Sequence, residues 1–183
     1  SCIDGGRWDV EAGAKLGARR SAVFAVPSRA AVMATEYAPA CAIAFATSEP
    51  PRKVARQTFN LFAKIREIDE LMTPALQQRV VECHPELAFW ALNGEVPLEL
   101  PKKLKSRPFG PGLALRRELL AKAGYNEAWL AARFFRAAEA GPDDLLDAAA
   151  CSWSAARIAA GEAQRLPDAP SCDGRGLRTE IWA

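Results

Sequence analysis

The sequence has little of what common metal and nucleotide sites require. It contains one histidine, His84, and no C-x-x-C pair, which excludes sites built from several histidines and the zinc site of nucleobase deaminases. It also contains no glycine-rich phosphate loop and no nucleophile elbow. These absences direct attention to carboxylates and basic side chains, which the sequence does cluster.

A strong net charge and a long apolar run are also missing. The 24 basic and 22 acidic residues give a formal charge of +2, so any basic site must be local. No apolar run approaches the length of a membrane span, and no signal peptide is visible. We therefore expect no association with a membrane.

The cysteines do not form the pattern of a disulfide framework. There are five, an odd number, and they are widely spaced. This indicates free thiols in a reducing compartment, so we expect a cytoplasmic protein. With 183 residues, half of them hydrophobic, the chain is long enough for a real core, and we expect a single domain over residues 1–183.

Local patterns predict a chain made mostly of helices. Helices are expected at residues 8–16, 28–45 with a kink or break at Pro39, 52–72, 86–92, 113–123, 126–139 and 142–163. Short strands are expected at residues 21–26, 79–84 and 176–183, and a long loop at residues 95–112. This inventory predicts an α+β fold in which helices predominate.

The most regular pattern lies in residues 52–72. Apolar positions recur there every three or four residues, which is typical of an amphipathic helix with one buried face. The residues expected on that face are Val54, Thr58, Leu61, Phe62, Ile65, Ile68 and Met72.

Three aspartates open the last predicted helix. The pairs Asp144–Asp147 and Asp143–Asp147 have i, i+3 and i, i+4 spacing, so both lie on one helix face. Such a face can hold Mg²⁺ through oxygen ligands. The same residues also fit an ordinary helix start, because proline and acidic residues are favoured in the first turn. Asp144 and Asp147 are the candidate metal ligands if the first interpretation holds.

A second polar cluster surrounds the only histidine. Glu82, His84 and Glu86 alternate along a segment expected to be a strand, where they would point to one side. They are therefore candidates for the lining of a catalytic cleft. The alternative is a polar strand end, with Glu86 beginning the next helix.

A basic stretch follows in the predicted loop. No acidic residue occurs between Glu99 and Glu118, and a basic run of this kind can bind phosphates. A solvated loop is the alternative. The candidate residues for nucleic-acid or anion binding are Lys102, Lys103, Lys105, Arg107 and Arg116.

Several segments together resemble the domain of unknown function family 429, a group of predicted nucleases with a ribonuclease H-like fold. The segments are WDVEA (8–12), LGARRSAVF (16–24), RKVARQTF (52–59), KIREID (64–69), ECHPELAFWALNG (82–94), DDLLDA (143–148) and GLRTEIWA (176–183). The block 82–94 is the most specific of these. Because the resemblance begins near Trp8, we expect the chain to lack the family's N-terminal strands.

The resemblance implies a metal-dependent nuclease that uses Mg²⁺ or Mn²⁺ at carboxylates. Asp143, Asp144 and Asp147 would hold the ion, beside Glu82, His84 and Glu86. Without the N-terminal strand carboxylates, the resemblance implies an incomplete two-metal site.

Two other functions remain open. The first is a non-enzymatic interaction module, expected to form a homodimer through residues 21–26 or 79–83, because a reduced sheet leaves an open edge. The second is binding of a small anionic ligand by the basic loop.

Overall fold

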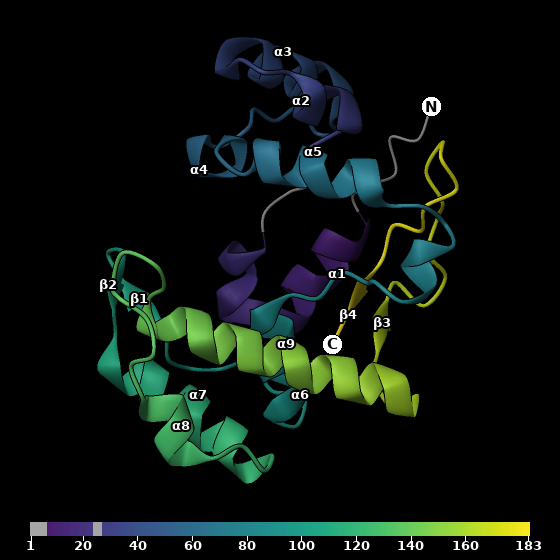
Figure 1. Ribbon diagram of the computed structural model, residues 1–183. Coiled ribbons are helices and arrows are strands. Elements are labelled where there is room, and N and C mark those ends of the chain that lie inside the picture. The colour runs from purple at the N-terminus through teal and green to yellow at the C-terminus, as the bar shows by residue number, and fades with distance from the viewer. Residues whose placement is uncertain (1–6, 24–26) are drawn as a thin grey trace. The chain divides into compact units, whose positions relative to one another are not determined.

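The computed structural model describes residues 7–23 and 27–183, and helices predominate there (Figure 1). The chain divides into two compact units. The described part of unit 1 consists of residues 7–10, 27–81 and 167–180, and unit 2 consists of Glu11–Val23, Glu82–Leu166 and Ile181–Ala183. A single domain over residues 1–183 stays a prediction, and each unit is described by itself.

Unit 1 is built from short helices around a small apolar core. Helix α2 (Arg29–Met33) packs on α3 (Tyr37–Thr47) and on α5 (Phe62–Leu71), and α4 (Arg56–Phe59) lies against α3. The Ser28 side chain caps α2 by accepting a hydrogen bond from its backbone. The buried core residues are Ala31, Val32, Ala40, Cys41, Ala44, Val54 and Phe62.

The orientation of α5 differs from the sequence prediction. Phe62 is buried as predicted, whereas Leu61, Ile65 and Ile68 are exposed. The polar side chains explain the difference, because Arg66 donates to the Val32 carbonyl oxygen over 2.7 Å and Asp69 pairs with Arg29. These contacts fix the buried face of α5 at Phe62, Arg66 and Asp69, and the apolar stripe beside it stays outside.

Unit 2 contains the longer helices. Helix α9 (Pro142–Ala160) packs against α6 (Pro85–Leu92) and α7 (Gly110–Lys122), and α8 (Glu127–Ala131) packs against α7 (Figure 1). Most of α1 (Arg7–Leu16) also belongs to this unit. The buried core residues are Ala88, Phe89, Leu98, Leu113, Leu119, Leu120, Leu130, Leu146, Ala149 and Ala150.

The strands of the described residues are very short. Strand β1 (Lys103–Leu104) pairs with β2 (Arg107–Pro108), and β3 (Arg165–Leu166) pairs with β4 (Ile181–Trp182), both antiparallel. A single bridge joins Cys83 to Trp182. Helices with a few short strands agree with the predicted α+β class. No larger sheet occurs in the described residues, so the ribonuclease H-like fold stays a prediction.

Two predicted strands are wrong over the residues described. Ser21 and Ala22 lie in a 3-10 helix, η1 (Gly17–Ala22), while residues 24–26 lie outside the described part. In residues 79–84 only Cys83 makes a bridge, because the expected partner strand is reduced to Ile181–Trp182. The sheet edges that supported a homodimer are therefore not found in the described residues.

Other predicted boundaries also move. The helix expected at residues 28–45 breaks at Ala34, and Pro39 lies inside α3 near its start, where proline needs no intrahelical hydrogen bond. Helix α8 ends at Ala131, well before residue 139, and residues 52–72 divide at Asn60. The loop expected at 95–112 holds the β1–β2 hairpin and the start of α7.

Among the helices of residues 7–23 and 27–183, none combines the length and apolar character that crossing a membrane requires. Cys41, Cys83 and Cys151 carry free thiols, as the sequence predicted. Cys2 lies outside the described residues.

A close backbone approach sets the position of the loop before β1. A Cβ atom at Gly112 in α7 would lie 1.8 Å from the Pro101 carbonyl oxygen, so only glycine fits there. The Phe109 amide then donates to the Lys102 carbonyl over 2.9 Å and closes the base of the hairpin. These contacts fix the backbone that carries Lys102 and Lys103.

We predict that Gly112→Ala lowers the free energy of unfolding by about 3 kcal/mol or more, because the added methyl group collides with backbone atoms. Gly110→Ala is the matched control in the same helix, since nothing lies within 4 Å of a Cβ at that position. The control is expected to change stability by less than about 1 kcal/mol. Urea unfolding followed by tryptophan fluorescence measures both, and equal effects would contradict the prediction.

Candidate functional site

The acidic cluster lies at the start of α9. Gly141 and Pro142 precede the first turn, and the Gly141 amide donates to Asp144 Oδ2 over 2.6 Å. Asp144 therefore caps the helix, as the ordinary helix-start interpretation predicted. Each of Asp143, Asp144 and Asp147 also offers an oxygen atom within 4.8 Å of the others. The cluster thus fits both interpretations that the sequence left open.

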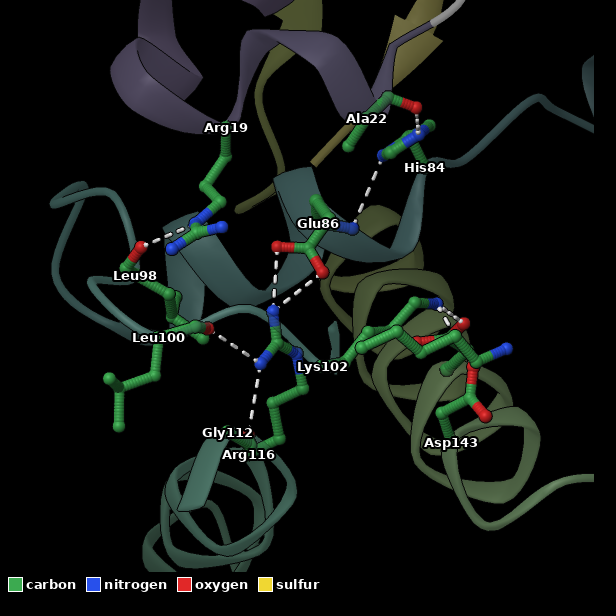
Figure 2. Close-up of polar contacts among 12 residues, drawn as sticks. Arg19, Ala22, His84, Glu86, Leu98, Leu100, Lys102, Gly112, Arg116 and Asp143 are labelled. Atoms are coloured by element: carbon green, nitrogen blue, oxygen red, sulfur yellow. Dashed lines mark hydrogen bonds and ion pairs between the residues drawn. The ribbon is translucent and has the colours of Figure 1, made fainter. Parts of the chain in front are cut away.

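Two lysines from the β1 region neutralise this cluster. Lys102 Nζ contacts Asp147 Oδ2 and lies 3.6 Å from Asp143 Oδ2, while Lys103 Nζ lies 2.7 Å from Asp143 Oδ2. Figure 2 shows Lys102 beside Asp143. Asp143 is 1% exposed. The Oδ1 atoms of Asp143 and Asp147 are buried and have no hydrogen-bond partner. The site therefore keeps two carboxylate oxygens that the lysines do not satisfy.

The pKa values of Asp143 and Asp147, the two inner aspartates of the cluster, are shifted in opposite directions. Burial acts to raise the pKa of Asp143, but the hydrogen bond from Lys103 and the charges of both lysines outweigh it, so the pKa lies below its usual range. Burial raises the pKa of Asp147, and the hydrogen bond and charge of Lys102 offset this only in part. The Asp143 and Glu86 charges also raise it. The site therefore stabilises the charged form of Asp147 less well than that of Asp143.

Glu86 and Arg116 form a buried ion pair between α6 and α7. Arg116 Nη2 lies 2.6 and 2.8 Å from the two Glu86 carboxylate oxygens, and the Arg116 side chain has no exposed surface (Figure 2). Arg116 Nη1 also donates to the carbonyl oxygens of Leu100, over 3.1 Å, and Gly112, over 2.9 Å. This pair positions the loop that leads to Lys102, and gives both residues a structural role.

His84 uses both ring nitrogens in hydrogen bonds. Its Nδ1 accepts from the Glu86 amide over 3.2 Å and so caps α6, and its Nε2 donates to the Ala22 carbonyl over 3.1 Å (Figure 2). This pattern requires the neutral ring. Burial lowers the pKa of His84, and the nearby Lys102 charge lowers it further, against the Ala22 and Glu86 contacts. His84 therefore acts as a neutral clamp between residues 11–23 and α6.

The other predicted residues lie on the surface. Glu82 is exposed, and its carbonyl oxygen accepts from the Trp182 amide over 2.9 Å. Lys105 and Arg107 are exposed on the β1–β2 hairpin, and neither pairs with an acidic side chain among the described residues. The structure thus brings Lys102 and Lys103 to the three aspartates and pairs Arg116 with Glu86. Phosphate binding by these residues stays a prediction.

Sequence reasoning missed one support of the site, Arg19, and one contact beside it, between Cys83 and Cys151. Arg19 Nε donates to the Leu98 carbonyl over 3.2 Å, and its Nη2 contacts the Glu99 carbonyl, which holds the loop before Lys102 (Figure 2). Cys151 lies one helical turn beyond Asp147 in α9, and its partner is Cys83, which lies just before α6. The hydrogen bond between the two thiols lowers the pKa of Cys83 and raises that of Cys151. The Asp147–Cys151 spacing places Cys151 next to the acidic cluster, but it does not indicate the contact with Cys83.

We predict that Arg116→Met costs about 3–5 kcal/mol of unfolding free energy, because it leaves the Glu86 carboxylate buried and unpaired. The double variant Glu86→Leu/Arg116→Met is expected to be more stable than this single variant, because no buried charge remains. Urea unfolding of the full double-mutant cycle measures the coupling. Lys122→Met, which breaks the exposed pair with Glu118, is the control and should change little. Additive effects of the two buried changes would contradict the interpretation.

We predict that stability falls as the pH drops below about 6.5, because unfolded His84 then takes up a proton that the folded protein excludes. The loss continues until the pH reaches the lowered pKa of folded His84. His84→Asn keeps an acceptor for the α6 amide and cannot titrate, so its stability should lack this fall. Urea midpoints on both sides of the ordinary histidine pKa test it, and His84 is the only histidine present. An unchanged pH profile in the variant would assign the fall to other groups.

Comparison with models of known protein families gives a match. A family profile described as "Protein of unknown function (DUF429)" matches residues 4–171. The match includes the blocks 82–94 and 143–148, whereas residues 176–183 lie beyond it. Comparison with curated proteins and with solved structures gave no match. Because the profile covers most of the sequence, the protein belongs to the DUF429 family.

Proposed function

We propose that unit 2 binds a divalent cation at Asp143, Asp144 and Asp147 and uses it in the hydrolysis of phosphodiester bonds in nucleic acid. One observation carries the proposal. Three carboxylate oxygens lie within 4.8 Å of one another, and two of these side chains keep a buried oxygen without a hydrogen-bond partner. A buried acceptor that lacks a donor costs free energy, which a bound cation would recover.

The chemistry of the donors suits a hard cation. Mg²⁺ and Mn²⁺ prefer carboxylate oxygens, and Asp143 and Asp147 contribute these from one face of α9. Asp144 is already committed in part to the Gly141 amide, so it is the weaker ligand. A bound ion would neutralise phosphate charge and lower the pKa of a water molecule.

The adjoining hairpin supports a phosphate-bearing substrate. Lys105 and Arg107 are exposed on it, and the Lys103 side chain is 42% exposed beside Asp143. Lys105 and Ser106 both have positive φ, 47° and 65°, an uncommon conformation that directs the turn. Basic side chains beside a metal site can hold the phosphates that flank a scissile bond.

Among the residues that the structure describes, one carboxylate cluster is found, which supplies ligands for one ion rather than two. Two-metal catalysis needs carboxylates from further elements. The Glu86 charge raises the pKa of Asp147, but the Glu86 carboxylate is already paired with Arg116. Glu82 is exposed and has no contact with the cluster that the structure describes. We therefore expect the proposed nuclease to use one ion at these aspartates and to be a weak catalyst.

A second candidate function is a non-enzymatic interaction module that forms a homodimer. It is favoured by the exposed stripe on α5, where Leu61, Ile65, Ile68 and Leu71 are 47%, 40%, 58% and 66% exposed. Self-association of a chain that shows no response to metal ions would favour this function over hydrolysis.

We predict that Mn²⁺ or Mg²⁺ raises the melting temperature. An ion at a hundred-fold excess over its Kd adds about 2.7 kcal/mol, which corresponds to roughly 5–10 °C for a chain of this size. Asp143→Asn/Asp147→Asn should abolish the rise and any metal-dependent cleavage of single-stranded nucleic acid. Glu139→Gln, at an exposed carboxylate paired with Arg136, is the control and should keep both.

Differential scanning fluorimetry with and without metal, and a cleavage assay on a labelled oligonucleotide, provide the two measurements. A wild-type protein whose melting temperature ignores both ions would refute the metal site. A rise that survives in the double aspartate variant would place the ion elsewhere.

A further inference from the structure

The Lys102 ammonium group occupies the place that a cation would take in the acidic cluster. It contacts Asp147 Oδ2 and lies 3.6 Å from Asp143 Oδ2, so one positive charge bridges the two inner carboxylates (Figure 2). Its side chain is 27% exposed, and Lys103 adds a second ammonium group on Asp143. Without these lysines, the α9 aspartates would be close like charges in a partly buried place.

We propose that Lys102 is a built-in counter-ion that a divalent cation must displace, and that the displaced ammonium group then binds substrate phosphate. The inference rests on the proposed function and adds a regulation to the same site. Metal and phosphate then strengthen each other's binding, because each is bound best when Lys102 has left Asp147.

Electrostatic repulsion makes the two occupants exclusive. An ammonium group and a divalent ion on the same pair of carboxylates would lie within a few ångströms of each other in a site of reduced dielectric constant. The repulsion falls on the more movable partner, which is the flexible lysine stem. Asp143 and Asp147 cannot move in the same way, since both belong to α9.

The unpartnered oxygens give the incoming ion a first contact. Asp143 Oδ1 and Asp147 Oδ1 are buried and accept no hydrogen bond, while the Oδ2 atoms face the lysines. An ion can therefore bind the Oδ1 atoms before the lysine contacts break. Displacement then exchanges one cation for another of higher charge, so the carboxylates are never left without a counter-ion.

The backbone keeps the displaced side chain near the site. The Lys102 carbonyl accepts from the Phe109 amide, and the preceding Pro101 is held against Gly112. Only the side chain is free to turn, so its ammonium group stays within reach of the cluster. A phosphate bound by the ion would meet Lys102 there, as well as Lys103.

Lys102→Met tests the exclusion, because methionine keeps a long apolar stem and removes the charge. Mn²⁺ affinity, measured from the paramagnetic resonance of the free ion, is expected to rise about ten-fold or more, the equivalent of about 1.4 kcal/mol. Lys105→Met removes a charge from the same hairpin and is the matched control, with a smaller effect expected because it does not touch the aspartates. Inorganic phosphate should tighten Mn²⁺ binding in the wild type and do so much less in Lys102→Met.

A second measurement uses the wild-type protein and so does not depend on how a variant folds. An amine-reactive reagent followed by mass spectrometry reports the accessibility of each lysine. Mn²⁺ should increase the labelling rate of Lys102 several-fold and leave that of Lys122, which pairs with Glu118, unchanged.

The outcomes separate the two proposals. If the wild type binds Mn²⁺ but Lys102→Met binds it equally or more weakly, or if Mn²⁺ leaves the labelling of Lys102 unchanged, the counter-ion role is overturned and the metal site stands. If neither protein binds Mn²⁺, the proposed function fails, and the counter-ion inference fails with it.

Discussion

The buried ion pair between Glu86 and Arg116 is the constraint on which unit 2 depends. It joins α6 to α7, and the same guanidinium group holds the carbonyl oxygens of Leu100 and Gly112. Removing two charges from water is costly, and here Arg116 Nη2 contacts both Glu86 oxygens while Nη1 makes the two hydrogen bonds to carbonyl groups, which offsets part of that cost. The guanidinium group also lies 5.3 Å from the centre of the Phe89 ring, within the core. The pair therefore specifies one arrangement of α6, α7 and the connecting loop.

That arrangement determines where the charged hairpin meets α9. Arg116 binds the Leu100 carbonyl oxygen, and the Pro101 backbone packs against Gly112. These contacts restrict the positions that Lys102 and Lys103 can take. They lie on the aspartates and give the acidic cluster its counter-charge. His84 and Arg19 hold the neighbouring segments in the same way, through backbone carbonyl groups. The position of the site thus depends on buried contacts made by residues outside the acidic cluster.

Membership of DUF429 names a family without naming an activity. What the structure adds is an acidic cluster with unsatisfied oxygens and a basic hairpin fixed beside it. Under the proposed function, this combination would bind a cation at the aspartates and a phosphate at the hairpin. The lysine contacts explain how such a cluster can be stable without an ion, and why its two inner carboxylates differ in pKa.

The sequence by itself determined the local features. The residues Gly141-Pro142-Asp143 begin a helix, Pro85 begins another, and the spacing of the three aspartates places their oxygens together. These follow from capping, proline geometry and helical periodicity, which act within a few residues.

Only the tertiary structure decided the partners. Arg116 was predicted to bind phosphate from a loop and helix start. In the structure it lies in the core, paired with Glu86, which is thirty positions earlier in the chain. Lys102 was predicted to bind phosphate, and the tertiary structure adds an ion pair with Asp147 of α9 that its local sequence does not indicate. In α5, the contacts of Arg66 and Asp69 bury a different face of the helix from the one that its apolar pattern predicts. Each choice depends on a group distant in sequence, because the free energy of a buried charge is set by what surrounds it, and local sequence carries no record of that.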